Sequence, residues 1–207
     1  MVLEHLDIRI RPLAEAWAPA GNFTFIHMDQ QTEARLLQLL DERDIHDVLM
    51  RYCRGVDRCD EQLIASCYHP DAVDDHGTWI VAGRDVARTI IGLVRPGPAV
   101  PMHFVGNVRI EVEGDEAFTE SYLLAFRTEE RDGRARTRTR ALRFVDRFTR
   151  RDGEWRISER VVTDDWNRVD EVVEAMADAP KFRRGRKDQD DPVYAIRRGR
   201  VAREPRS

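Results

Sequence analysis

The stretch RFTRRDGEWRISER, residues 147–160, decides the fold class of this 207-residue chain. Asp152 and Gly153 lie between two runs rich in β-branched, aromatic and apolar residues. An Asp-Gly pair in this setting is the strongest short signal for a β-hairpin. The runs on either side, residues 135–149 and 155–166, are therefore predicted to be antiparallel strands.

The same pattern extends from this hairpin toward the N-terminus. Two further strand-like runs precede it, at residues 102–112 and 116–128. Their connections are EGDE, residues 113–116, and RDGR, residues 131–134, and the second contains another Asp-Gly pair. This half of the chain is predicted to be an antiparallel meander within a sheet of four to six strands.

The part of the chain before the meander has a helical pattern. Apolar residues recur at three- and four-residue steps within residues 32–56, which predicts an amphipathic helix. Asp60 is a good N-cap for a second helix over residues 61–68, which Pro70 ends. A third helix is expected over residues 84–94, stopped by a Pro-Gly-Pro sequence.

Helices followed by a meander indicate an α+β fold, in which a curved sheet with helices across one face encloses a pocket. Between the second and third helices, residues 71–83 are expected to form a short strand or hairpin. Three parts are predicted: an N-terminal extension (1–31), an α+β domain (32–170) and a basic C-terminal tail (171–207). Met28 begins the helical stretch and is an alternative natural start.

Composition excludes several classes of protein. The chain is 35% charged, has no apolar run near the roughly 18 residues of a membrane span, and lacks the features of a signal peptide. A cytoplasmic protein without a membrane segment is expected. Residues 181–207 carry ten Lys and Arg against four Asp and Glu, about +6. Such a tail is more often solvated or packed on an acidic subunit than bound to nucleic acid.

The three cysteines, Cys53, Cys59 and Cys67, are an odd number without a CxxC pair. This pattern fits neither a zinc site nor a disulfide framework. Small free thiols on or near a helical face are expected.

Three residues could carry chemistry if they met in a cavity: Tyr52, Asp57 and His103. A neutral imidazole suits proton abstraction at neutral pH, and a carboxylate on its other nitrogen fixes the tautomer. A tyrosine hydroxyl can donate to an enolate or a leaving hydroxyl. Together these groups suit abstraction of a proton next to a carbonyl, followed by elimination or isomerisation.

Two features of the sequence argue against the convergence of these three side chains. Tyr52 and Asp57 lie about 140° apart on a continuous helix, so they converge only if the helix ends near Gly55. His103 opens a strand on the opposite face from the apolar residues that follow, and a bulge at Gly106 would turn it inward. If the residues do not meet, Asp57 is an ordinary carboxylate at the end of a helix, and the hydrogen bonds of His103 are made locally at the start of a strand.

Three motifs resemble the SnoaL-like branch of the nuclear transport factor 2-like superfamily. They are RYCRGVDRCDEQLIASCYHPDAVDDHG (51–77), MHFVGN (102–107) and RRDGEWRISER (150–160). The resemblance covers roughly residues 35–170 and implies a cone-shaped α+β barrel. Enzymes of this group include scytalone dehydratase, lindane dehydrochlorinase, bile-acid 7α-dehydratase and ketosteroid isomerase, whereas the β subunits of ring-hydroxylating dioxygenases are structural partners.

The resemblance assigns roles to several residues. The catalytic Asp–His pair of the dehydrochlorinase and the bile-acid dehydratase falls on Asp57 and His103. At position 52 the dehydrochlorinase pattern has lysine and the bile-acid dehydratase pattern has tyrosine, so Tyr52 favours loss of water. Arg160 aligns with an arginine of the dehydrochlorinase and is expected to bind substrate. Trp166, at the pocket end of the last strand, is expected to contact it too.

Two other clusters carry alternatives. His69, Asp71, Asp74 and His76 would be tempting as metal ligands, but the resemblance offers no metal there, and neither a metal nor a cofactor is expected. The four arginines at alternate positions within residues 134–140 fall on one strand face. A solvent-facing hairpin arm is expected, and a phosphate-binding role, as on a coenzyme A thioester, is the alternative.

The sequence as a whole predicts a lyase that needs no cofactor, of the dehydratase type. Its substrate is expected to be a hydrophobic carbonyl compound such as a steroid or polyketide intermediate. An isomerase with the same base, or a non-catalytic small-molecule-binding or subunit-assembly module, are the alternatives. Open sheet edges and the family resemblance favour a homo-oligomer, either a dimer or a trimer.

Overall fold

The fold was analysed in a computed structural model that describes residues 29–97, 100–172 and 181–199. The chain divides between Leu36 and Leu37 into two compact units. Most of the predicted N-terminal extension, residues 1–28, lies outside the described residues. The second unit holds the sheet, the pocket and all the candidate site residues.

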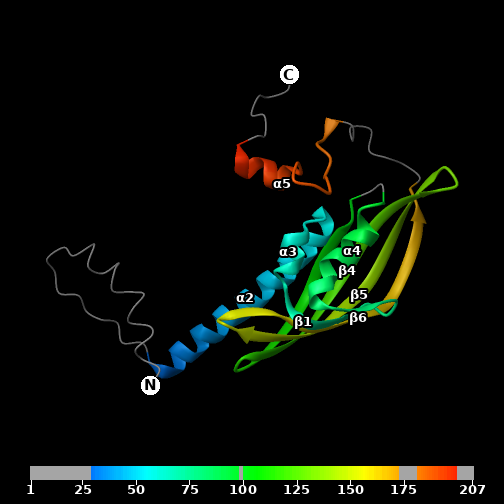
Figure 1. Cartoon of the computed structure of the whole chain (residues 1–207). Helices are drawn as coiled ribbons and strands as arrows, with labels where there is room; N and C mark the ends of the chain where they lie inside the picture. The colour runs from blue at the N-terminus through cyan, green and yellow to red at the C-terminus, as the bar shows by residue number, and fades with distance from the viewer. Residues whose placement is uncertain (1–28, 98–99, 173–180, 200–207) are drawn as a thin grey trace. The chain divides into compact units, whose positions relative to one another are not determined.

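A curved, unclosed sheet of six strands forms the body of the second unit (Figure 1). Its strands, in spatial order, are β2 (Ile80–Ala82), β1 (Tyr68–Asp75), β6 (Glu154–Glu171), β5 (Arg134–Arg151), β4 (Glu116–Arg131) and β3 (Met102–Glu113). The predicted α+β class and the four-stranded meander are confirmed. The sheet is mixed rather than wholly antiparallel, because β1 pairs parallel to β6. Parallel strands cannot be joined by a tight turn and need a long connection. Strands β1 and β6 are far apart in the sequence, so the chain between them provides that connection.

Helices α2 (Gln30–Arg58), α3 (Glu61–Ala65) and α4 (Gly83–Val94) precede the meander, as predicted. From Leu37 onward they cover one face of the sheet (Figure 1). The Asp60 carboxylate caps α3 by accepting from the backbone N–H of Leu63 at 3.1 Å. Helix α3 is shorter than predicted because Tyr68 already pairs in β1. Pro70 falls where the β1–β6 register shifts, so its missing N–H disrupts no regular ladder.

The core lies between the helices and the inner face of the sheet. Directly paired strand residues share a face, and the pairs Leu123–Leu142 and Ala117–Phe148 are buried. The buried face of α2 meets them with the apolar stripe predicted from the sequence: Ile45, Val48, Leu49, Tyr52 and Val56. Burial of this stripe, more than helix propensity, holds α2 against the sheet.

A bulge in β3 turns His103 toward the core. Between Val105 and Val108 strand β3 advances three residues while its partner β4 advances two. The extra residue, within Gly106–Asn107, swaps the faces of the strand. His103 therefore lies on the same face as Val108 and Ile110, as the sequence analysis required for a functional role.

The C-terminal segment 181–199 packs beside the helix ends and contains α5 (Pro192–Ala195) and the short 3₁₀ helix η2 (Ile196–Arg198). The Lys187 ammonium donates to the backbone carbonyls of Val94 and Arg95, at 3.1 and 3.0 Å, at the C-terminus of α4. A cation suits a helix C-terminus, where the last carbonyls lack partners. Among the helices of the described ranges, none combines the length and the hydropathy that a membrane span requires.

Candidate active site

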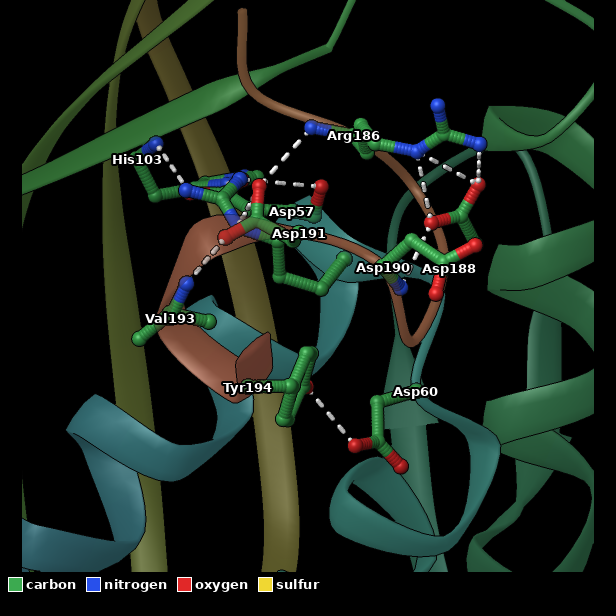
Figure 2. Close-up of polar contacts among 10 residues, drawn as sticks. Asp57, Asp60, His103, Arg186, Asp188, Asp190, Asp191, Val193 and Tyr194 are labelled. Atoms are coloured by element: carbon green, nitrogen blue, oxygen red, sulfur yellow. Dashed lines mark hydrogen bonds and ion pairs between the residues drawn. The ribbon is translucent and has the colours of Figure 1, made fainter. Parts of the chain in front are cut away.

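Asp57 and His103 form a close pair. Nδ1 of His103 lies 2.6 Å from Oδ1 of Asp57, and the backbone N–H of His103 donates to Oδ2 at 3.1 Å (Figure 2). A carboxylate can only accept, so the bridging proton belongs to Nδ1 of the imidazole. The other ring nitrogen, Nε2, then carries a lone pair and can act as a base.

The position of Asp57 depends on the close contact of two helices. From the sequence, Tyr52 and Asp57 would converge only if the helix ended near Gly55. Helix α2 instead continues through Gly55 to Arg58. A Cβ at Gly55 would lie 2.7 Å from Cγ1 of Ile64 in α3. The glycine therefore admits α3 against α2, and Asp57 stays on the last helical turn, facing β3.

A cavity of about 490 Å³ opens on the inner face of the sheet. Its lining includes Tyr52, His103 and His76, together with the apolar side chains Val56, Trp79, Ile90, Leu93, Val94, Leu142, Phe144 and Val162. Asp57 lies outside this lining and borders a second cavity of about 450 Å³, which His103 also lines. Asp57 thus holds the His103 ring on the side of the second cavity, and the ring also lines the first cavity.

Tyr52 reaches the cavity from α2 although it is buried. Its ring makes edge contacts with Tyr68 and Phe144, with centroids 5.8 and 5.6 Å apart. Burial raises the pKa of its phenol well above the ordinary value. The hydroxyl therefore stays protonated and can serve as a hydrogen-bond donor. The structure brings Tyr52 and His103 to one cavity without requiring a break in the helix.

Arg160 lies beneath the cavity and is not part of its lining. Its guanidinium is fully buried and donates to both carboxylate oxygens of Asp146, at 2.7 and 2.6 Å, and to the Tyr68 hydroxyl at 3.1 Å. Burial opposes the charge, but Asp146 and Tyr68 raise the pKa of Arg160 well above its usual value. Its donors face buried protein groups, and its contact with a substrate stays a prediction.

Trp166 also lies outside the cavity lining, with about half of its surface exposed. The β5–β6 register pairs Leu142 with Asp164 but Ala141 with Trp166, so one extra residue sits in β6. This bulge rotates Trp166 away and brings Asn167 to the cavity. The structure thus places Trp166 outside the cavity lining, and its contact with a substrate stays a prediction.

The suspected metal cluster separates into different contacts. His69 Nε2 lies 3.0 Å from the carbonyl oxygen of Thr149, and Asp71 forms an ion pair with Arg151 at 2.8 Å. Within the described ranges, no three His, Cys, Asp or Glu side chains are grouped to hold a metal ion.

A second His–Asp pair was missed in the sequence. Nδ1 of His76 contacts Oδ1 of Asp74, and the imidazole stacks on Trp79 with centroids 4.0 Å apart. His76 and Trp79 both line the cavity. The available signal was the Asp-x-His spacing at the end of a strand, which the metal hypothesis obscured.

Two of the four alternating arginines face the cavity. Arg138 and Arg140 are part of its lining and have carboxylate neighbours, Glu129 at 3.5 Å and Asp164 at 3.6 Å. Arg134 is exposed beside Glu171. The hairpin is thus solvent-facing at its tip, and nearer its base Arg138 and Arg140 give the cavity a charged margin.

The three cysteines are buried and free, as predicted. Burial raises the pKa of Cys53 to about 12 and that of Cys67 to about 11. Since the thiolate is the reactive form, these two thiols are poor nucleophiles at neutral pH.

The C-terminal segment reaches the dyad from the side of the second cavity (Figure 2). The Asp191 carboxylate accepts from the backbone N–H groups of Arg186 and Val193 and lies 3.3 Å from the guanidinium of Arg58. The Tyr194 hydroxyl donates to Asp60 at 2.8 Å. The segment thereby connects to both ends of the α2–α3 turn.

Comparison with known proteins gives a family. The profile of the SnoaL-like domain matches residues 37–161, more than half of the chain. Curated proteins gave no sequence match.

Solved structures share the fold at low identity. A hexachlorocyclohexane dehydrochlorinase of type 2 is 20% identical with a TM-score of 0.60, and the match covers 70% of this chain and 99% of that one. A protein from Novosphingobium aromaticivorans, provisionally described as a scytalone dehydratase, is 19% identical with a TM-score of 0.56 (67% and 97% covered). An NTF2-like protein from the same species is 24% identical with a TM-score of 0.54 (74% and 96% covered).

Proposed function

The chain belongs to the SnoaL-like domain family, and from this premise we propose that it is a lyase that eliminates water from a hydrophobic carbonyl compound. His103 is the base, Asp57 orients it, and Tyr52 donates a hydrogen bond to the carbonyl oxygen. A steroid or polyketide intermediate is the substrate class that suits the apolar cavity.

The observation that carries this proposal is the Asp57–His103 pair beside a cavity that has apolar walls and a charged margin. Asp57 fixes the proton on Nδ1 of His103, so Nε2 can accept a proton from the carbon next to the carbonyl. Asp57 also stabilises the imidazolium that forms. The protonated phenol of Tyr52 can stabilise an enolate, because a fixed hydrogen-bond donor favours developing negative charge.

Structural relatives support the reaction class. Two matched proteins carry names of elimination enzymes, a dehydrochlorinase and a dehydratase. A tyrosine rather than a lysine at position 52 favours the dehydratase reaction, according to the resemblance described above. The cavity volume of about 490 Å³ falls within the range for small-molecule sites, which supports a small-molecule substrate.

The test is turnover of a panel of β-hydroxy ketones, including steroid and aromatic-polyketide compounds, by the parent and by His103→Ala. Loss of a general base typically costs about 100- to 10,000-fold in rate. We expect that loss in kcat for His103→Ala and a smaller loss for Asp57→Asn, while ligand binding measured by calorimetry persists in both variants.

The control is His46→Gln, which alters a partly exposed histidine of α2 outside both cavities. It should leave kcat unchanged. Near-normal turnover by His103→Ala would refute the mechanism. Migration of a double bond without loss of water would indicate an isomerase, and binding without turnover of any panel member would indicate a binding module.

We further propose that the protein is a homo-oligomer. The outer face of the sheet exposes Phe104, Phe118, Tyr122, Val145 and Val161. Strand pairing places these residues on one side: Tyr122 stands opposite Arg143, and Val145 lies between Glu120 and Val161. The exposed apolar side chains alternate on this face with the ion pairs of Arg143 and Arg147, and aromatic residues together with arginine are enriched at interfaces between subunits.

A further inference from the structure

The structure contains a second imidazole held in the same way as His103. His76 follows β1 in a tight turn, in which its backbone N–H donates to the Trp79 carbonyl at 3.0 Å. Its Nδ1 contacts the fully buried carboxylate of Asp74, and the Trp79 ring covers one of its faces. The proton between them lies on Nδ1, so Nε2 is the nitrogen available to a ligand.

Asp74 is itself held in place by a buried network. Its second oxygen accepts from the Tyr68 hydroxyl at 2.5 Å, and that hydroxyl accepts from Arg160 at 3.1 Å. Arg160 is paired with Asp146. This chain of contacts leaves Asp74 no freedom to turn away from His76, which gives the imidazole one orientation.

His76 supplies a hydrogen-bond donor that the buried Asp74 carboxylate needs. Arg160 pairs directly with Asp146 and reaches Asp74 only through the Tyr68 hydroxyl. A buried carboxylate is costly unless it is hydrogen-bonded, and the Tyr68 hydroxyl and the His76 ring contact its two oxygens.

His76 and His103 line one cavity. In the described part of the chain, Nε2 of neither ring has a hydrogen-bond partner. Elimination of water needs an acid as well as a base, because hydroxide is a poor leaving group. Tyr52 cannot supply the proton readily, since burial raises the pKa of its phenol.

We propose that His76 is the general acid of the elimination and that Asp74 is its positioning residue; this rests on the proposed function. His103 Nε2 takes the proton from the carbon next to the carbonyl, and the C–H electron pair becomes the new C=C bond. The C–O bond breaks as the leaving oxygen takes the proton from Nε2 of His76, and water departs. Transfer of one proton from His103 to His76 through solvent restores the starting state.

The test compares two leaving groups on the β-hydroxy ketone that the panel identifies. Acetate departs without a proton, so the β-acetoxy analogue needs the base but no acid. The variant His76→Asn retains an amide N–H near the position of Nδ1, facing Asp74, and removes Nε2. We expect it to slow elimination of water by about 100-fold or more and to change elimination of acetate little.

A second measurement reports proton abstraction by His103 without the departure of water. In deuterium oxide, His76→Asn should still exchange the proton next to the carbonyl at a rate close to the parent's. Imidazole added to His76→Gly should restore part of the water elimination. His46→Gln serves as the control for both measurements.

The outcomes separate this inference from the proposed function. Loss of both eliminations in His103→Ala, with selective loss of water elimination in His76→Asn, supports both. Equal loss of both eliminations in His76→Asn, or no loss, overturns the acid role. Turnover by His103→Ala overturns the proposed function. If neither His76 variant folds, ¹⁵N NMR of the parent with a bound β-hydroxy ketone decides. Protons on both Nδ1 and Nε2 support the acid role, and a ring that carries a proton on only one nitrogen overturns it.

Discussion

Gly55 lies at the closest contact between the two helices that position Asp57. Its α-carbon faces Ile64, and a Cβ there would also lie 3.1 Å from the Ile64 backbone nitrogen. Backbone cannot move aside as a flexible side chain can. The glycine therefore keeps the α2–α3 turn compact, and this turn sets the distance from Asp57 to His103.

We predict that Gly55→Ala destabilises the protein although alanine favours helix. Forcing a methyl group into a packed contact costs about 1–3 kcal/mol, which exceeds the gain in helix propensity of about 0.5–1 kcal/mol. The matched control is Gly92→Ala in α4, where a Cβ meets nothing within 4 Å. Urea denaturation should show the free energy of unfolding falling in the first variant and rising in the second. A rise in both would contradict the role of Gly55.

Arg160 and Trp166 show what residue types alone cannot reveal. An arginine late in a strand could bind a substrate or a buried carboxylate, and here Asp146, on the neighbouring strand, takes it. The indole is turned away by one extra residue in β6. Neither a partner across strands nor a register shift is visible in a single sequence.

Helices and strands were predicted from the sequence better than contacts between side chains. The Asp-Gly pairs fixed the hairpins, since a two-residue turn with left-handed backbone suits Asp and Gly; both Asp152 and Gly153 have positive φ, 54° and 79°. Asp57 and His103 were found because their motifs resemble a known family. His76 was missed because its partner Asp74 looked like a metal ligand in a crowded turn.

The C-terminal segment is predicted to detach from the α2–α3 turn in acid. Burial alone would raise the pKa of Asp191, but the backbone N–H groups of Arg186 and Val193, together with Arg58, lower it. A carboxyl with a lowered pKa in the folded state stabilises the contact above about pH 4, its unfolded value, and the contribution is lost as the pH falls through the folded value. The contact should therefore be intact at neutral pH.

Hydrogen exchange of the Val193 amide, which donates to Asp191, measures this contact. Protection should be constant down to about pH 4 and should decrease as the pH falls further, after correction for the intrinsic exchange rate. Asp191→Asn should show low protection across the whole range, whereas Asp190→Asn, at an exposed aspartate of the same segment, should behave as the parent. Protection that is independent of pH would show that the carboxylate does not hold the segment.

For the molecule as a whole, the outer face of the sheet predicts self-association. Val145→Lys places a cation beside Glu120 within the exposed apolar face, which the monomer tolerates and an interface does not. Light scattering after size-exclusion chromatography should show the parent as a dimer or trimer and Val145→Lys as a monomer. Ile80→Lys, on the short strand β2, is the control and should assemble as the parent does. A monomeric parent would exclude the oligomer.

The bulge in β3 makes the regularity of one strand a determinant of chemistry. Five residues separate Val108 from His103, so a regular strand of this length would turn His103 outward and Phe104 inward. The bulge absorbs the odd residue. Deletion of Gly106 or Asn107 would therefore remove the bulge and leave His103 facing the cavity opposite Ala125. Loss of the bulge without loss of a residue would instead exchange His103 for Phe104 with hardly any change in fold. The parity of the strand and the bulge together thus separate a site that moves protons from one that only encloses a ligand.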